Sequence, residues 1–322
     1  MNNLIRIALA GSISGVILFG VEKLVTHYLK ENKNSKTSYV VAANLSYDAL
    51  FLGHCMPAFT VSPNAFDSVT GMNSFNLAQL EASYAENLIM LHLYLMNNPT
   101  PEYLFLSATP ESFDRNFNDF HAYRYAQFLD DTLVRSIVEL EDPEFYRWSF
   151  LPYMKFGFYN SEISFNALQG WKHKRNNRSK PYFTDGLELP KDELGNRPFE
   201  KLSYAKAYQF TWDETLAEYF DRIVKMAQDH GITIILFETP LNKELSNPDM
   251  LPNRKEYLSR IDSIADKNKL RFWRFDESEL TESLENYYST LNLKYPAVLR
   301  FSKELGERFK EEYGGDRTKR NE

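Results

Sequence analysis

The sequence predicts a three-layer α/β/α fold with a central parallel sheet and a largely helical insertion. Three observations predict it: short apolar runs bounded by turn residues, helical patterns between those runs, and one long stretch that breaks the alternation. The 322 residues are 43% hydrophobic and 25% charged, which is ordinary for globular proteins and excludes a mostly disordered chain. A net charge of −7 argues against a nucleic-acid-binding protein.

Five short apolar runs are the strand candidates: residues 49–52, 75–77, 103–107, 232–237 and 271–275. Helical patterns separate them, with apolar side chains at helical spacing over residues 80–95, 211–227, 257–265 and 296–309. Strands that alternate with helices predict a parallel sheet covered on both faces, as in the flavodoxin-like arrangement.

Local signals predict where two of these helices begin and end. Thr211 and Glu214 have the spacing of a capping box, and Gly231 follows the last turn of the same helix. Pro296 is a suitable first helical position for the final helix. An apolar stripe follows Pro296, so this helix is expected to pack on the sheet.

The beginning of the chain is an apolar segment. Residues 7–21 read IALAGSISGVILFGV, fifteen residues without a charge, and Arg6 precedes them while Glu22 and Lys23 follow. Three interpretations stay open: a membrane anchor that runs from Leu4 to Val25, a cleaved signal peptide, and a buried core helix. No small-residue cleavage site follows the segment, which favours the anchor.

Composition divides the chain into four parts. Residues 1–28 are the membrane anchor or signal-like helix, and residues 29–44, which are rich in lysine and asparagine, are a polar tether. Residues 45–313 are a single α/β domain, and residues 314–322 are a polar tail. The aromatic-rich stretch from about 110 to 208 lacks alternating strand signals, so we expect a largely helical insertion there.

One segment of this insertion is strongly basic. Residues 171–180 read WKHKRNNRSK and include five lysines and arginines but no acid. Such a run could hold a phosphate, an anionic glycan or lipid headgroups, and it could equally be a solvated loop.

The counts of cysteine and histidine limit the chemistry. Cys55 is the single cysteine, so neither an intrachain disulfide nor a multi-cysteine metal site can form. Six histidines are present, and none follows His230 in the last 92 residues. No spacing of His, Asp or Glu matches a metal-ligand pattern, so we expect no metal or other cofactor.

Cys55 comes directly after the first predicted strand. The run DALFLG leads into His54 and Cys55, and the functional residues of parallel sheets lie at the carboxyl ends of strands. Gly53 permits a sharp turn there, and a thiol at the start of a helix is more easily ionised. A lone cysteine can equally be a small buried apolar residue.

Two blocks of the sequence resemble SGNH/GDSL-type hydrolases, and most closely the membrane-anchored members of bacterial cell-surface polysaccharide acylation systems. The first block is FLGHCMPAFTVSPNAF followed by FNLAQLEASY, which resembles the family's first strand, its Gly-x-Ser motif and its second strand. The second is YSTLNLKYPAVLRFSKEL, which resembles the closing block, in register over Leu293, Phe301 and Ser302. The resemblance covers about residues 45–110 and 230–312.

This resemblance implies specific roles for residues of the chain. Cys55 holds the place of the family's nucleophilic serine, Ser289 that of its aspartate, and Asn292 that of its general-base histidine. Asparagine cannot accept the proton of a nucleophile, and serine cannot supply the charge that orients an imidazole. The catalytic motifs are therefore degenerate.

The family's oxyanion-hole donors are also altered. The glycine of the second block should follow residues 75–77, but no glycine occurs between Gly71 and Gly157. After residues 103–107, Asn116 is the available counterpart of the third-block asparagine. The resemblance thus implies a site with Cys55, Ser289 and Asn292 at catalytic positions, and with Gly53, His54, Asn76 and Asn116 at binding positions.

Three functions are compatible with these features. The first is a membrane-anchored, non-catalytic SGNH-like protein in cell-surface polysaccharide assembly or acyl modification. The second is an active esterase or acyltransferase with Cys55 as the nucleophile, and the third is an unrelated α/β binding protein. The resemblance implies an extracytoplasmic domain, with membrane lipid around the N-terminal helix and a membrane acyltransferase or a glycan as partner.

Overall fold

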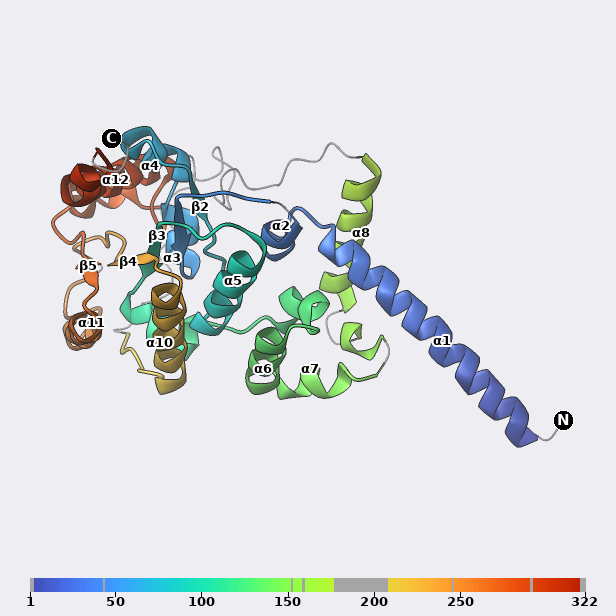
Figure 1. Cartoon of the computed structure of the whole chain (residues 1–322). Helices are drawn as coiled ribbons and strands as arrows, with labels where there is room; N and C mark the ends of the chain where they lie inside the picture. Colours follow the sequence, from blue (N-terminus) through green and yellow to red (C-terminus); the bar gives the residue numbers. More distant parts are fainter. Residues whose placement is uncertain are drawn as a thin grey trace. The chain divides into compact units, whose positions relative to one another are not determined.

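The computed structural model describes residues 3–42, 44–151, 153–157, 160–176, 208–244, 246–289 and 292–318. They form two compact units (Figure 1). The helical unit comprises Met1–Asn44, Met96–Asn98 and Phe120–Tyr182, and the sheet unit comprises Leu45–Leu95, Pro99–Asp119 and Phe183–Glu322.

The sheet unit contains a five-stranded, wholly parallel sheet. Its strands are β1 (Ala49–Leu52), β2 (Ser74–Asn76), β3 (Tyr103–Ser107), β4 (Thr233–Phe237) and β5 (Arg271–Trp273). They are ordered β2-β1-β3-β4-β5, with Leu50 opposite Phe75 and Leu104 at the centre of the sheet. This is the flavodoxin-like order, so the predicted fold class is confirmed.

Helices of the sheet unit lie on both faces of this sheet (Figure 1). They are α3 (Cys55–Thr60), α4 (Pro63–Thr70), α5 (Tyr84–Asn97), α10 (Glu214–Asp229), α11 (Arg254–Asn268) and α12 (Tyr295–Thr318). Short 3-10 helices are η1 (Pro110–Phe113), η2 (Arg115–Phe117), η5 (Glu279–Glu282) and η6 (Leu284–Asn286).

Side chains that alternate along each strand pack on the two faces of the sheet. Phe51, Phe105 and Phe237 belong to one core with α4 and α12, and the ring of Phe105 lies 5.8 Å from that of Phe309. On the other side, Tyr84 of α5 packs edge-on against Phe220 of α10 at 5.3 Å. Successive strand side chains point to opposite faces, so burial of both faces requires continuous apolar strands, as observed.

The start of α10 differs from the prediction. Asp213 is its N-cap, and its carboxylate accepts a hydrogen bond from the Leu216 amide at 3.0 Å. The capping box expected from Thr211 and Glu214 is therefore wrong, because Thr211 instead donates its amide to Asp114 at 2.8 Å. Gly231 follows the helix in a left-handed conformation, as its position predicts.

The helical unit is built from α1 (Asn3–Lys30), α2 (Lys36–Ala42), α6 (Thr132–Glu141), α7 (Pro143–Trp148) and α8 (Asn160–Asn176), with the 3-10 helices η3 (Ala122–Phe128) and η4 (Met154–Phe156). Residues 29–44 differ from the expected polar tether. They include α2, and Ser38 is buried, with its hydroxyl donating to the Leu29 carbonyl at 2.9 Å. Part of the segment is thus folded against α1.

Two other segments, the basic run and the predicted polar tail, are helical over part of their length. The basic run 171–180 is helical up to Asn176, the end of α8, and its remainder lies outside the described residues. The predicted polar tail begins inside a helix, because α12 continues to Thr318.

Among the described residues, one helix is long and apolar enough to cross a membrane. It spans Ile5–Lys30 within α1, with a mean hydropathy of 1.6 in its most apolar stretch. Its large apolar side chains from Ile5 to Val21 are exposed, with Ile7 at 70% and Val16 at 72%, whereas Leu29 near its end is buried. A long apolar segment with exposed side chains on every side is typical of a membrane span.

Candidate functional site

Polar residues follow the carboxyl ends of four of the five strands. Gly53, His54 and Cys55 follow β1, Thr109 follows β3, Glu238 follows β4 and Asp276 follows β5. Ligands of open parallel α/β sheets bind at this edge. The structure therefore places the first predicted site residues where the fold class requires them.

Gly53 is the point at which β1 turns into α3. Its φ is +154°, and a Cβ there would lie 2.6 Å from Cγ of Pro57 and 2.7 Å from Cβ of Ser107. Its carbonyl accepts the Gln79 amide at 3.3 Å. Gly53 is thus required by the close approach of β3 and α3, which is a reason for its presence independent of any ligand.

His54 is held by the protein at both ring nitrogens. Its Nδ1 accepts a hydrogen bond from the Met56 amide at 3.3 Å, which caps α3, and its Nε2 lies 3.1 Å from the Thr109 hydroxyl. Because Nδ1 is an acceptor, Nε2 carries the proton and donates to Thr109. Burial lowers the pKa of His54 to about 4, so the ring is neutral at pH 7.

Cys55 is the first residue of α3, and its sulfur contacts the loop after β2. Its Sγ accepts a hydrogen bond from the backbone amide of Glu81 at 2.9 Å. Glu81 has a φ of +57°, in the left-handed region that glycine favours. No glycine occupies the second block, yet the chain adopts a glycine-like conformation at Glu81 and directs its N–H at Cys55.

Asn76 is wholly buried and holds the scaffold together. Its amide donates to the carbonyls of Pro57 at 2.8 Å and Val61 at 3.0 Å, and its Oδ1 accepts the Ala78 amide at 3.0 Å. These bonds join the end of β2 to α3. The side chain expected at a binding position is thus engaged within the protein.

Asn116 lies in η2 and is exposed. Its side-chain amide and its backbone amide both donate to Oδ1 of Asp114, each at 2.9 Å. Asp114 also accepts from the Tyr208 hydroxyl at 2.9 Å. Asn116 therefore forms part of a local turn, whereas Thr109 is the polar residue nearest the end of β3 in the chain.

Ser289 and Asn292 are brought together by the segment before α12. The Asn292 side-chain amide donates to the Ser289 hydroxyl at 3.0 Å, and the backbone carbonyl of Asn292 accepts the Tyr288 amide at 3.1 Å. Ser289 is buried. The two residues at the family's acid and base positions thus pair with each other, and their approach to Cys55 stays a prediction of the resemblance.

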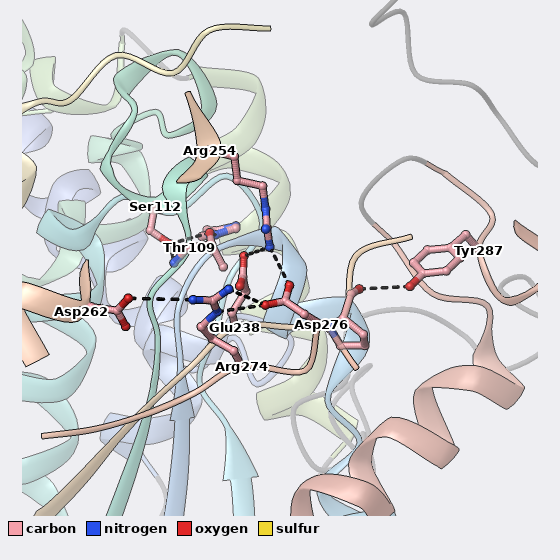
Figure 2. A network of polar contacts seen from close by, with 10 residues as sticks. Thr109, Ser112, Glu238, Arg254, Asp262, Arg274, Asp276 and Tyr287 are labelled. Carbon is pink, nitrogen blue, oxygen red and sulfur yellow. Dashed lines mark hydrogen bonds and ion pairs between the residues drawn. The ribbon is translucent and has the colours of Figure 1, made fainter. Parts of the chain in front are cut away.

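An ionic cluster at the ends of β4 and β5, largely buried at Glu238 and Arg254, was not predicted from the sequence (Figure 2). Arg254 Nη2 lies 2.6 Å from Oε1 of Glu238 and 3.2 Å from Oδ1 of Asp276, and Arg274 Nη2 lies 2.7 Å from Oδ2 of Asp276. One sequence signal could have found it: ILFE places an acid immediately after a buried strand.

Burial makes Glu238 a weaker acid than a free glutamate. Desolvation raises the pKa of Glu238 to about 7, against the favourable charge of Arg254, and it also raises the pKa of Glu111. Within the described part of the chain, Oε2 of Glu238 and Nε of Arg254 are buried without a hydrogen-bond partner. Glu238 is therefore a carboxyl group that can exchange a proton near neutral pH.

Among the residues that the structure describes, no group of three or more His, Cys, Asp or Glu side chains could hold a metal ion.

Two solved structures are similar to this chain. A GDSL-like lipase from Bacteroides thetaiotaomicron is 10% identical, with a TM-score of 0.41 over 87% of this chain and 98% of that chain. A proposed acylhydrolase from Bacteroides fragilis is 10% identical, with a TM-score of 0.38 over 81% of this chain and 86% of that chain. No family model matches the chain, and no curated protein matches it. The first structure is of the GDSL type that the sequence itself resembles, while the fold class rests on the observed sheet.

Proposed function

We propose that this chain is a membrane-anchored protein whose SGNH-hydrolase-like domain has lost ester hydrolysis and acts in cell-surface polysaccharide assembly or acyl modification. In this role the domain binds a glycan or a membrane acyltransferase, and it lies on the extracytoplasmic side of the membrane. The apolar α1 supports the anchor, and the parallel sheet with Cys55 after β1 supports the hydrolase-like domain.

The observation that carries this proposal is the pairing of Ser289 with Asn292 at 3.0 Å. In the resemblance these residues stand at the acid and base positions, and neither side chain can accept a proton from a nucleophile at neutral pH. His54, the imidazole next to Cys55 in the chain, is neutral and committed to the Met56 amide and to Thr109. The proton-transfer relay of a hydrolase is thus replaced by local hydrogen bonds.

An esterase assay tests the loss of catalysis. The full chain in detergent is compared with Cys55→Ala on short acyl esters and on an acyl thioester. We expect the same background rate from both proteins. A rate for the native chain that exceeds Cys55→Ala by tenfold or more would contradict the proposal.

A reconstruction tests the assignment of positions. A variant with Cys55→Ser, Ser289→Asp and Asn292→His restores the family's three residue types, and Cys55→Ser alone is its matched control. We expect the triple variant to hydrolyse short acyl esters measurably faster than the control. Equal rates, in a protein whose circular dichroism spectrum is unchanged, would count against the assignment of Ser289 and Asn292.

Interaction partners are tested by affinity purification of the anchored protein from membranes after crosslinking. We expect a membrane acyltransferase or a component of polysaccharide assembly in the purified material, and also expect its loss when the sheet unit is unfolded before crosslinking. Recovery of neither class of partner would count against a role in surface-glycan assembly. Protease accessibility of the domain in intact cells tests the extracytoplasmic side.

A second candidate function is acyl transfer through Cys55, and one observation favours it. The Glu81 amide donates to the sulfur at 2.9 Å, and a hydrogen bond to the charged form of a thiol favours the thiolate. In this reaction the thiolate attacks an acyl thioester, a new thioester forms at Cys55, and the donor thiol leaves. Incubation with an acyl thioester, followed by intact mass measurement, would show an acyl adduct that is absent from Cys55→Ser.

A further inference from the structure

We infer that an apolar surface of the helical unit rests in the lipid interface beside α1, as a second contact with the membrane. The surface, called the interfacial patch, consists of Phe150, Leu151, Met154, Phe165, Leu168 and Trp171. All six side chains are exposed, with Phe150 at 69% and Phe165 at 61%. Contiguous exposed apolar residues mark a surface that meets a partner or a membrane.

Half of the patch lies along one face of α8. Phe165, Leu168 and Trp171 are spaced three residues apart, so their side chains follow one another along the helix. Ile163 is buried on the side of α8 opposite Phe165, and Asn166, Gly170 and His173 face α1 from that side. The apolar stripe is therefore a face that α8 does not use for its own packing.

A close backbone contact fixes α8 against α1. A Cβ at Gly170 would lie 1.7 Å from the carbonyl oxygen of Tyr28, so only glycine permits this approach. Next to this contact, the Asn32 side-chain amide donates to Oδ1 of Asn166 at 3.0 Å, and Nδ1 of His173 accepts the Lys33 amide at 3.1 Å. The stripe on α8 is thus held at a set position near the end of α1.

The other half of the patch is fixed to α1 by Glu22. The carboxylate of Glu22 lies 2.8 Å from Lys155 Nζ and accepts the Tyr153 amide at 3.0 Å. Both charged side chains are largely buried, at 15% and 11% exposure. Leu151 and Met154, on either side of Tyr153 in the chain, therefore lie near Glu22 along the axis of α1.

The length of α1 sets this level relative to a bilayer. The uncharged run of residues 7–21 covers only about 22 Å at ~1.5 Å per residue, whereas a hydrocarbon core is about 30 Å thick. A span of about 20 residues that begins at Ile5 ends at Leu24, so Glu22 lies in its last turn. The ion pair with Lys155 neutralises Glu22 where a lone charge would be costly.

These contacts favour membrane lipid as the partner of the interfacial patch. The patch is attached to the membrane span through Glu22 and Gly170, it contains Trp171 and two phenylalanines, and the exposed Lys172 lies beside Trp171 on α8, whereas Lys174 pairs with Glu31. Aromatic and apolar side chains next to lysines are typical of surfaces that lie in the interface of anionic membranes. The inference rests on the membrane anchor of the proposed function, and on no claim about catalysis.

The test measures the depth of single labelled positions in the full chain. In a Cys55→Ser background, Leu151→Cys and Leu168→Cys are each labelled with an environment-sensitive fluorophore. Ser136→Cys, on the exposed side of α6 in the same unit, is the matched control. The proteins are reconstituted in vesicles of phosphatidylcholine and phosphatidylglycerol that contain lipid with a quenching doxyl group near the headgroup.

We expect several-fold stronger quenching and blue-shifted emission at positions 151 and 168 than at position 136. Quenching at 151 and 168 that equals the value at 136 would overturn the inference, because the patch would then face water or protein. Val16→Cys, labelled in the same way but measured in vesicles whose doxyl group lies near the end of the acyl chain, distinguishes this result from failure of the anchor, because residue 16 lies near the middle of the span. Quenching at 16 but not at 151 or 168 overturns the second contact alone, whereas absence of quenching at 16 overturns the transmembrane anchor.

Discussion

Glu238 is a residue whose acid–base chemistry departs strongly from that of its free side chain. It lies directly after β4, its carboxylate is buried beside Arg254, and its pKa is raised to about 7. The cause is removal from water, which disfavours the charged form more than one arginine can offset. The neighbouring charges of Asp276 and Glu111 act in the same direction.

This shift predicts a pH dependence of stability. Between the ordinary value of 4.5 and about 7, folded Glu238 keeps a proton that the unfolded chain has released, so the unfolding free energy falls as pH rises through this window. Glu238→Gln removes this titration, and we expect a flatter profile. Urea unfolding in detergent at a series of pH values measures it, and parallel profiles for the two proteins would contradict the raised pKa. Because Asp276 and Glu111 are coupled to Glu238, the difference between the two profiles reports the titration of Glu238 together with its effect on these two carboxyl groups.

Glu81 carries backbone strain next to Cys55. A side chain at φ +57° costs about 1–2 kcal/mol relative to glycine, and a β-branched side chain is worse. We therefore expect Glu81→Gly to be more stable than Glu81→Val by about 1–2 kcal/mol, measured by denaturant unfolding. Both variants remove the glutamate side chain, so the contacts of that side chain do not enter the difference. Equal stability of the two would show that residue 81 is not held in the left-handed conformation.

At the scale of elements, the crossing of α1 and α8 depends on one glycine. Alanine is normally the better helix former by about 1 kcal/mol, yet a Cβ at Gly170 would lie 1.7 Å from the Tyr28 carbonyl oxygen. Gly170→Ala would push the two helices apart, and we expect the free-energy cost of this separation to exceed the gain in helix propensity.

We expect Gly170→Ala to lower the stability of the helical unit by about 1–3 kcal/mol, the usual cost of overpacking. Gly20→Ala is the matched control, since nothing lies within 4 Å of a Cβ at that position on α1. Limited proteolysis of the detergent-solubilised chain measures the difference. Unchanged cleavage rates between Gly170→Ala and Gly20→Ala would contradict the close approach of α1 and α8.

For the whole molecule, the apolar α1 predicts an integral membrane protein that keeps its N-terminal segment. A helix that crosses the membrane and buries the uncharged run 7–21 in lipid binds far more strongly than a peripheral surface, so the protein should resist extraction by high salt and alkaline carbonate. Intact mass measurement of the detergent-extracted protein should give a mass that includes residues 7–21. A mass that lacks the apolar segment would instead support the signal peptide.

Prediction from the sequence succeeded wherever a local pattern decides the structure. The five strands appear within two residues of their predicted bounds, because continuous apolar runs between turn residues become buried parallel strands. Cys55 was correctly placed after β1. The N-cap of α10 was missed, because Thr211 and Asp213 are both good caps and the contact with Asp114 decides between them.

The residues expected at binding positions show the limit of such reasoning. Asn76 and Asn116 have the right residue type near the right strands, but their hydrogen bonds go to Pro57, Val61 and Asp114. Residue type and spacing do not specify which partner a side chain reaches. The Glu238–Arg254 pair joins residues from the end of β4 and the start of α11, and its burial cannot be read from either segment alone.

The sequence by itself determined the parallel α/β sheet, the apolar first helix and the position of Cys55 at the end of β1, because each depends on patterns within a few neighbouring residues. Only the tertiary structure decided that the Cys55 sulfur receives the Glu81 amide, that Ser289 pairs with Asn292, and that Glu238 is a weak acid. The physical reason is that hydrogen-bond geometry and desolvation depend on which distant segments pack together.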